Sequence, residues 1–482
     1  MSISRREFSA MVAATGATLA ASAAGAAAKR LPAYTEVDVL VIGAGLSGLQ
    51  SALLLEEQGA KVQVIEAQRR VGGRIWTLFD RPGFPEVGGN GFAVGYGRVL
   101  DRARALGLPL FDYAPRRAAH PGMELFVRGQ RLSREQWAAS PLNPLPAAAR
   151  QRMPWEFGGA LVSQRNPLKA AEDWTAPQNA ALDVSMRDWV AAQGVDDASI
   201  ELCWTTNPYF GSSAHDVSAL QCLFNDAWIK VITQGSPSTL SIEGGNQKLP
   251  QAMAAKLARE VHHGREVVHI EDGGGAVTVT CADGARYKAG RVVCSLPFSV
   301  LRHVRITPGL TGRQVEAVTS LGYMVNTLVF FVPKRRYWEQ DGLNPTMWTD
   351  GIAGNVMAQR FGKDANEVTA IVANPRGTAA TWLDRLPPRE AVARIKAEIE
   401  RLRPAARGAL EGGWIHSWAR DPHAAGDWAI YGPGQVTRFA RTLATAHGRI
   451  HFCGEHTAQS NRGMEGAMES AERAVLEVLG AG

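Results

Sequence analysis

The 482-residue sequence has only five cysteines, and their spacing suits neither a metal cluster nor a disulfide framework. They are an odd number at wide, irregular intervals: Cys203, Cys222, Cys281, Cys294 and Cys453. We therefore expect most of them to be buried as small apolar side chains.

Long apolar runs and clustered charges are also missing. No run has the length and apolarity of a mature transmembrane helix, so stable membrane insertion is not expected. The net charge is +6, but the charged residues are scattered, so a nucleic-acid partner is not expected either. No Ser/His/Asp set, metal cluster or pair of closely spaced carboxylates stands out. A hydrophobic share of 45% in a chain of this length predicts a soluble globular protein of two or three domains.

The N-terminus differs from this globular composition. Arg5 and Arg6 precede a weakly apolar run rich in Ala, Gly and Thr, residues 9–28, which is typical of a twin-arginine export signal. The alternative is an Ala-rich tail with a chance arginine pair. The first interpretation predicts a signal peptide over residues 1–28 and a periplasmic protein that is exported after folding.

The clearest motif follows at residues 38–66. A β-rich run enters a G-x-G-x-x-G turn made by Gly43, Gly45 and Gly48, an Ala/Leu-rich helical segment follows, and a second short strand ends at Glu66. The glycines allow a tight turn, close approach of a pyrophosphate and close packing of helix on strand. The helix N-terminus attracts phosphate, and an acid at this distance accepts hydrogen bonds from a ribose. The segment predicts a βαβ dinucleotide-binding unit.

Two glycine-rich turns, residues 69–74 and 86–92, come directly after this unit. Arg74 in the first turn is a suitable partner for a diphosphate, although an exposed loop arginine is the alternative. From about residue 95 to 240 the sequence predicts a mostly helical, proline-rich insertion without further nucleotide motifs. Short strands are expected at 267–270, 277–279, 291–297 and 327–332, and an amphipathic surface helix at 389–402.

The C-terminal segment returns to nucleotide-site chemistry. Residues 449–457, which end in Gly454-Glu455-His456-Thr457, predict a strand followed by a turn. Gly463-Met464-Glu465-Gly466-Ala467 then opens a helix that is expected to run to about residue 479. A second helix N-terminus beside a cofactor would stabilise negative charge.

Together these motifs resemble the flavin-dependent amine oxidases of the monoamine oxidase type. The resemblance implies an α/β fold in which a discontinuous Rossmann-like FAD-binding domain is interleaved with an α+β substrate-binding domain of mixed sheet and helices. The FAD-binding domain would comprise residues 34–94, 241–300 and 440–482, and the substrate-binding domain residues 95–240 and 301–439.

The resemblance also implies the reaction and the cofactor contacts. FAD accepts a hydride from the carbon next to an amine nitrogen, and the imine is then hydrolysed, so the partner is a small-molecule amine. The oligomeric state stays open, with a homodimer as one option. The implied FAD contacts are Gly43, Gly45, Gly48, Glu66, Arg74, Glu455, Met464 and the backbone of Val268.

Three departures from the family pattern bear on catalysis. Trp428 would form one wall of the aromatic pair that faces the flavin, unless it is an ordinary core tryptophan, and Gly463 stands where a second aromatic is often found. A cage that is open on one side should admit a bulkier or secondary amine. Asp427 replaces the cysteine that binds flavin covalently in the mammalian-type enzymes, so FAD is expected to be non-covalent.

Asn326 stands where the family usually has a lysine that holds a water against the flavin. Its presence predicts slow reoxidation by dioxygen, and export would make a periplasmic electron carrier available as the acceptor. An FAD-dependent desaturase acting on C–C bonds and a non-catalytic FAD-bound protein are the alternative functions. Other candidates are His456 as a base or structural group, Arg462 as a carboxylate ligand, and an aromatic pocket formed by Trp204, Tyr209, Phe210, Phe224 and Trp228.

Overall fold

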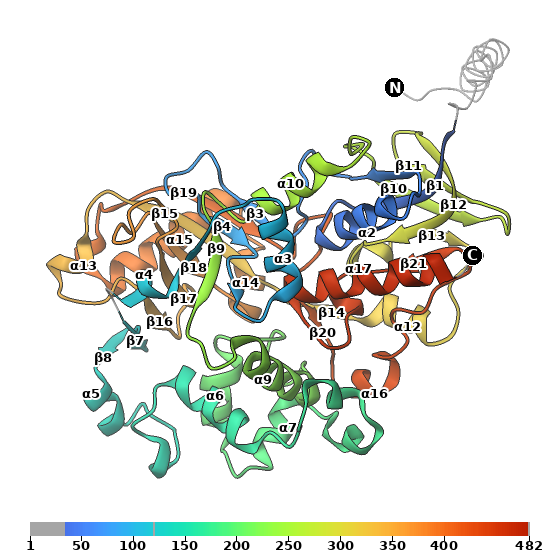
Figure 1. Cartoon of the computed structure of the whole chain (residues 1–482). Helices are drawn as coiled ribbons and strands as arrows, with labels where there is room; N and C mark the ends of the chain where they lie inside the picture. Colours follow the sequence, from blue (N-terminus) through green and yellow to red (C-terminus); the bar gives the residue numbers. More distant parts are fainter. Residues whose placement is uncertain (1–33, 119–120, 481–482) are drawn as a thin grey trace, which may run out of the picture.

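The computed structural model describes residues 34–118 and 121–480, so the predicted export signal lies outside the described residues. Two seven-stranded sheets dominate the chain. Helices pack against them, and both ends of the described chain lie beside the first sheet (Figure 1). This mixed architecture confirms the predicted α/β fold class.

The predicted βαβ unit forms one half of the first sheet. β1 (Thr35–Ile42) pairs in parallel with β2 (Val62–Ile65), and α2 (Leu46–Glu57) connects them. All four residues of β2 and most of β1 are buried, as expected for strands covered on both faces. This half of the sheet therefore carries the glycine-rich turn at the carboxyl end of β1.

Segments distant in the sequence complete the first sheet. β10 (Val267–Asp272), β11 (Val277–Cys281) and β12 (Arg286–Cys294) form an antiparallel meander, and β12 also pairs in parallel with β1. β13 (Arg305–Thr307) joins β10, and β21 (Ile450–Phe452) joins the last part of β12. The carboxyl end of β21 therefore reaches the same edge as that of β1.

The second sheet has the strand order β19-β15-β18-β17-β16-β7-β8. The amphipathic helix predicted at 389–402 is α15 (Pro388–Leu402), which buries Ile395, Ile399 and Leu402 in the core beneath this sheet. The strands are β7 (Glu124–Val127), β8 (Gln130–Leu132), β15 (Thr327–Pro333), β16 (Met347–Thr349), β17 (Asn355–Gln359), β18 (Ala370–Asn374) and β19 (Leu410–Ser417).

The hairpin β7–β8 comes from the stretch that the sequence predicts to be mostly helical. Most of the stretch is helical, but short strands also occur in it because its apolar positions find partners in sheets built elsewhere. The domain boundaries themselves remain a prediction. The longer helices here are α3 (Gly97–Ala105), α6 (Pro154–Arg165) and α9 (Ala219–Thr233), and shorter ones are α4 (Ala114–Ala118), α5 (Arg134–Ala139), α7 (Met186–Ala191) and α8 (Asp197–Ile200).

The C-terminal helix α17 (Gly463–Gly480) packs against α2 and α3, which brings the two ends of the sequence together. The small strands are β3 (Trp76–Thr77), β4 (Glu86–Gly88), β5 (Phe92–Ala93), β6 (Leu110–Asp112), β9 (Thr239–Ile242), β14 (Gly322–Tyr323) and β20 (Ala429–Ile430). The other helices are α10 (Lys248–Lys256), α11 (Phe298–Leu301), α12 (Gly312–Ser320), α13 (Tyr337–Gln340), α14 (Gly377–Leu383) and α16 (Gln435–Phe439).

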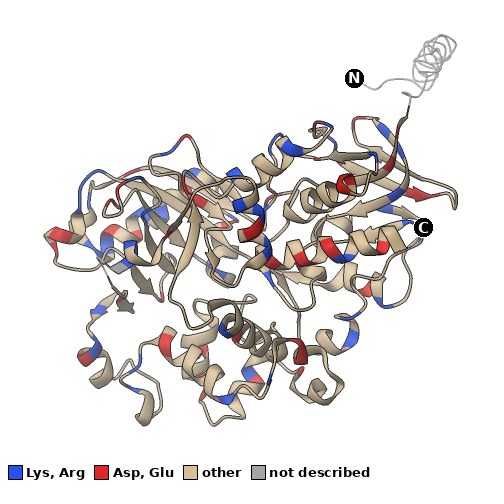
Figure 2. Cartoon of the chain, viewed as in Figure 1, with Lys and Arg blue, Asp and Glu red and all other residues tan. Residues whose placement is uncertain are grey.

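Lys and Arg residues are interspersed with Asp and Glu over the described chain (Figure 2). None of the described helices combines the length and apolarity that crossing a bilayer requires. All five cysteines are free thiols, and Cys281, Cys294 and Cys453 are buried, which confirms the expectation for most of them.

Candidate active site

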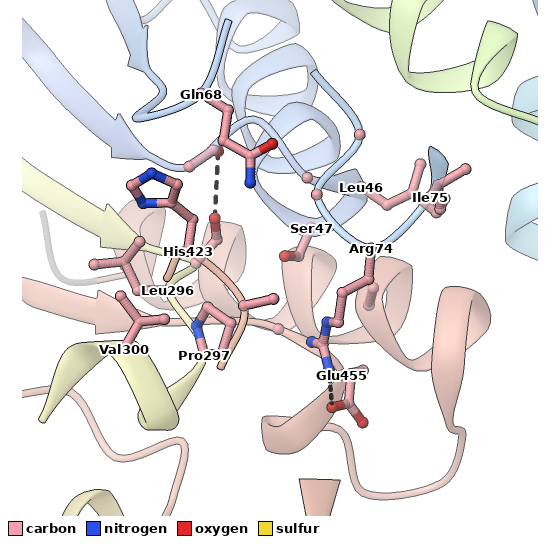
Figure 3. Close-up of a pocket in the computed structure, with 18 of the residues that line it drawn as sticks. Leu46, Ser47, Gln68, Arg74, Ile75, Leu296, Pro297, Val300, His423 and Glu455 are labelled. Atoms are coloured by element: carbon pink, nitrogen blue, oxygen red, sulfur yellow. Dashed lines mark hydrogen bonds and ion pairs between the residues drawn. The ribbon is translucent and has the colours of Figure 1, made fainter. Parts of the chain in front are cut away.

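A cavity of about 440 Å³ lies at the carboxyl ends of β1 and β21. Its wall includes residues of the fingerprint turn, among them Gly45 and Glu66, and residues of the C-terminal segments, among them Glu455 and Met464. The two sets of motifs, about 400 residues apart in the sequence, therefore share one cavity. Figure 3 shows side chains from both sets facing each other across it.

The turn between β1 and α2 leaves space for a ligand. Gly45 is the N-cap of α2, and a β-carbon added there would meet nothing within 4 Å. Gly43 has φ +98° and donates its N–H to the carbonyl of Ile65 at 2.8 Å, which ties the turn to β2. The free N–H groups at the start of α2 therefore point into open space, as a bound phosphate requires.

Gly48 serves the packing of the helix rather than the cavity wall. A β-carbon at Gly48 would lie 2.0 Å from the carbonyl oxygen of Gly43, so only glycine lets α2 approach the turn this closely. Glu66 lines the cavity and accepts hydrogen bonds from the N–H groups of Ala44 and Gln68, both at 2.8 Å. Val268 lines the same cavity and is 41% exposed.

Arg74 and Glu455 form an ion pair in the cavity wall (Figure 3). Arg74 Nη1 donates to Glu455 Oε1 at 2.8 Å and also to the carbonyl of Asp427, and the N–H of Ala429 donates to the same carboxylate oxygen. Burial alone would raise the pKa of Glu455, but Arg74 and Arg462 outweigh it and hold this pKa below its usual value. Glu455 is therefore ionised, and the Arg74 guanidinium is fixed beside the cavity.

A series of hydrogen-bonded side chains leads from Asp427 away from the cavity. Asn326 Nδ2 donates to Asp427 Oδ2 at 2.7 Å, Asn374 Nδ2 donates to Asn326 Oδ1 at 2.5 Å, and Arg376 Nε donates to Asn374 Oδ1 at 2.8 Å. Asp427 lines the cavity, whereas Asn326 lies behind it and is only 7% exposed. Asn326 therefore acts on the cavity through Asp427.

The surroundings of Asp427 oppose its ionisation. Burial raises the pKa of Asp427, and the Asn326 hydrogen bond together with the positive charges of Arg74 and Arg376 offsets only part of that rise. Glu455 raises it further. A carboxyl group with a raised pKa thus stands in the cavity wall.

Trp428 and Gly463 lie next to each other in the cavity wall. A β-carbon at Gly463, whose φ is +56°, would be 3.3 Å from the indole of Trp428. Met464, the second residue of α17, lines the cavity as well. The implied FAD contacts, together with Trp428 and Gly463, therefore all line the cavity except Gly48, which like Asn326 supports the wall from behind.

His456 and Arg462 do not line the cavity. Burial lowers the pKa of His456 to about 3, and neither ring nitrogen has a hydrogen-bond partner among the described residues. The ring instead packs against Phe298, with centroids 4.4 Å apart, which favours a packing role over the predicted role as base or hydrogen-bonding group. Arg462 is 5% exposed and donates to the carbonyl of Ala429 at 3.0 Å.

The aromatic residues predicted to form a substrate pocket either pack against other rings or lie at the surface. Trp204 packs edge-on against Phe157, Phe224 stacks on Trp174, and Tyr209 is 59% exposed. None of the five aromatic residues predicted for a pocket lines the cavity in the described chain. Tyr96 also lines the cavity, and sequence reasoning misses it because it lies in a stretch without a motif.

A Rossmann-type turn with an open helix N-terminus, an acid at the end of β2 and a buried ion pair in the same cavity indicate a dinucleotide-binding protein. The comparisons with known proteins identify its family. The model of the flavin containing amine oxidoreductases matches residues 46–479, so the chain belongs to this family.

Relatives and solved structures agree with this assignment. The chain is 26% identical to amine oxidase [flavin-containing] B of Cavia porcellus, covering 93% of this chain and 87% of the relative. It is 25% identical to the flavin-dependent L-tryptophan oxidase RebO of Lentzea aerocolonigenes, covering 91% and 97%. The structure of cyclohexylamine oxidase from Brevibacterium oxydans has the same fold, with a TM-score of 0.76 at 20% identity over 93% and 99% of the two chains.

The family membership establishes the class of reaction. The protein is an FAD-dependent enzyme that oxidises an amine. The open space at Gly45 and the Arg74 guanidinium, which Glu455 holds in place, fit a dinucleotide cofactor with a charged diphosphate.

Proposed function

We propose that this enzyme binds FAD without a covalent bond, oxidises a bulky or secondary amine, and passes the electrons to dioxygen only slowly. The observation that carries the proposal is the single cavity that joins the dinucleotide turn at Gly45 to the wall formed by Trp428 and Gly463. Because the cofactor and the substrate must meet, a cavity that is shared by both sets of residues is what the reaction needs.

The residues of the cavity have separate tasks in this proposal. Gly45 and the N-terminus of α2 would receive the pyrophosphate, Glu66 the ribose and Val268 the adenine side. Arg74 and the N-terminus of α17, which begins at Gly463, would face the remainder of the cofactor. FAD supplies the hydride acceptor when it is bound.

Trp428 would orient the amine, and the buried wall would exclude water. A dry wall also favours the neutral amine over the ammonium ion, because burial without a partner disfavours charge. The missing side chain at Gly463 leaves the neighbouring face of Trp428 open. This is the support for a bulky or secondary amine.

The non-covalent attachment is supported by the cavity wall. Asp427 stands at the position of the flavin-linked cysteine of the mammalian-type enzymes, and no cysteine is among the described residues that form the wall. Cys453 faces α2 instead, with its sulfur 3.9 Å from Ser51 Oγ. Acid precipitation should therefore release all the yellow flavin into the supernatant. Flavin fluorescence that stays with the denatured chain would contradict this.

Slow reaction with dioxygen is supported by Asn326. Its side chain is an uncharged amide, and both ends of this amide are engaged by Asp427 and Asn374. It therefore supplies no positive charge beside the cavity. A periplasmic electron carrier would then be the acceptor, and export by the twin-arginine signal would bring the enzyme to it. Both remain proposals that rest on the sequence motif and on Asn326.

A panel of primary, secondary and tertiary amines tests the proposed function. Each amine is added to the purified yellow protein without oxygen, and the flavin absorbance is followed. Bleaching by amines supports the proposal, whereas bleaching only by a hydrocarbon or ring substrate that can be desaturated would support the desaturase alternative.

A further inference from the structure

The Tyr96 side chain is a buried polar group that the cofactor contacts above do not use. Tyr96 is 7% exposed and lines the cavity, and it is the N-cap residue of α3. Its ring packs against Trp228, with centroids 5.8 Å apart, and Trp228 is itself fixed because its Nε1 donates to Asn461 at 3.1 Å. The Tyr96 ring is therefore held in place from behind.

The hydroxyl of Tyr96 points at the space beside Gly463. A β-carbon added to Gly463 would lie 3.8 Å from Tyr96 Oη and 3.3 Å from the indole of Trp428. The two side chains thus face the same small volume, which the absence of a side chain at Gly463 leaves free. The phenolic oxygen of Tyr96 is the polar group beside this volume, and the indole of Trp428 is the apolar group beside it.

The hydroxyl has no hydrogen-bond partner among the described residues, although charged groups lie nearby. Glu465 is engaged by the N–H groups of Arg98 and Val99 and by the Arg98 guanidinium. Arg462 donates to the carbonyl of Ala429. These neighbours therefore leave the hydroxyl, which faces the cavity, free for a ligand.

The hydroxyl is protonated at neutral pH. Burial raises the pKa of Tyr96, Tyr209 and Glu465 raise it further, and Arg462 opposes them only in part. A neutral phenol has one donor and an oxygen that accepts hydrogen bonds. The Tyr96 oxygen can therefore accept an N–H.

Building on the proposed function, we propose that the Tyr96 hydroxyl accepts a hydrogen bond from the N–H of the bound amine and so selects substrates that keep at least one N–H. This contact leaves the nitrogen lone pair free to assist the loss of hydride from the neighbouring carbon. A tertiary amine has no N–H in its neutral form and cannot make the contact. The substrate class is therefore a primary or secondary amine, with Trp428 against its apolar part.

Replacing Tyr96 by Phe removes the hydroxyl and keeps the ring that packs on Trp228. The dissociation constants of a secondary amine and of its N-methylated tertiary counterpart are measured by calorimetry on chemically reduced holoenzyme without oxygen, at one pH, and each constant is referred to the concentration of the neutral amine. Because the reduced flavin cannot accept a hydride, the measurement reports binding alone. Tyr34→Phe, outside the cavity, is the matched control.

We expect Tyr96→Phe to weaken the binding of the secondary amine about tenfold and that of the tertiary amine less than twofold. Tyr34→Phe should change neither dissociation constant. Equal weakening of both amines would overturn the inference, since it would mean that the hydroxyl donates to the lone pair or acts through packing. Unchanged affinity for the secondary amine would overturn it too. If no amine bleaches the wild-type flavin, the proposed function fails instead, so the two failures are distinguishable.

Discussion

Asp427 in the cavity wall accepts a hydrogen bond from Asn326 behind it, at the place where a lysine would supply a positive charge. The Asn326 amide is engaged on both sides, and burial raises the pKa of Asp427. Neither side chain therefore offers a cation that could stabilise negative charge developing on dioxygen. The proposed slow reaction with dioxygen rests on this arrangement.

Restoring a cation should accelerate reoxidation. In Asn326→Lys, the ammonium group would stand near the place where charge develops, and we expect the amine-reduced enzyme to react with dioxygen roughly tenfold faster or more. Rapid mixing of reduced enzyme with oxygenated buffer measures the rate. Asn326→Met has a chain of similar length without the charge, and an equal acceleration there would contradict the electrostatic explanation.

Glu86 is a second buried acid with a shifted pKa. It is 1% exposed, and burial raises its pKa from 4.5 to about 8, although Asn246 and Thr77 donate hydrogen bonds to it. The folded state then binds the proton more tightly than the unfolded state. Its contribution to stability is complete below pH 4.5 and is lost as the pH rises towards 8.

The replacement Glu86→Gln should remove this pH dependence. We expect the free energy of unfolding of the wild type to fall, relative to the variant, by up to about 1.4 kcal/mol per pH unit between pH 5 and 8. Urea unfolding at several pH values measures the difference. Parallel pH profiles for the two proteins would show that Glu86 is ionised in the fold throughout this range.

Single residues differ in how far the sequence specifies them. Gly45, Glu66 and Arg74 could be selected because a motif fixes their spacing, and the structure places all three in the cavity wall. Tyr96 could not, since its position depends on the packing of α3 against α17, which is long-range. Asn326 was selected by its position in the family pattern, but its burial behind Asp427 is a tertiary feature.

Among the secondary elements, α2 and α17 define the cavity. They pack against each other, and both begin at its wall. The periodicity of the sequence predicts both helices and the main strands, because local propensity and burial agree there. Periodicity does not predict the β7–β8 hairpin, because its partner strand, β16, lies more than 200 residues away in the sequence.

The start of α2 provides a matched pair of glycine variants. A β-carbon at Gly45 meets only open space, whereas one at Gly48 would collide with the carbonyl of Gly43. We expect Gly45→Ala to leave the melting temperature of the FAD-free protein unchanged while weakening FAD binding at least tenfold. Gly48→Ala should instead lower stability by roughly 1–3 kcal/mol.

Thermal unfolding and flavin titration of the FAD-free proteins separate the two effects. A large loss of stability in Gly45→Ala would mean that the turn itself, rather than the ligand, requires glycine there. Full FAD affinity in the same variant would remove Gly45 from the cofactor site.

At the scale of the whole molecule, strands from near the two ends of the described chain lie in the same sheet. β1 and β21 lie on either side of β12 although more than 400 residues separate them. The resemblance of the motifs predicts this arrangement, whereas composition and periodicity alone do not. A cofactor site assembled from both ends also requires the chain to fold before the cavity exists, which suits an export route that carries folded proteins.

We propose that export depends on the arginine pair Arg5 and Arg6. The double substitution Arg5→Lys, Arg6→Lys keeps the charge, and we expect it to leave the enzyme in the cytoplasm with its FAD bound. Cell fractionation followed by flavin fluorescence measures the distribution. An unchanged periplasmic yield in the variant would contradict the twin-arginine assignment.

An anaerobic titration of the purified holoenzyme with a secondary amine shows whether one cavity brings FAD and an amine together for oxidation. We expect one equivalent of amine to bleach one equivalent of flavin and to yield one equivalent of carbonyl compound after hydrolysis. A flavin that stays fully oxidised with excess primary and secondary amines would contradict it.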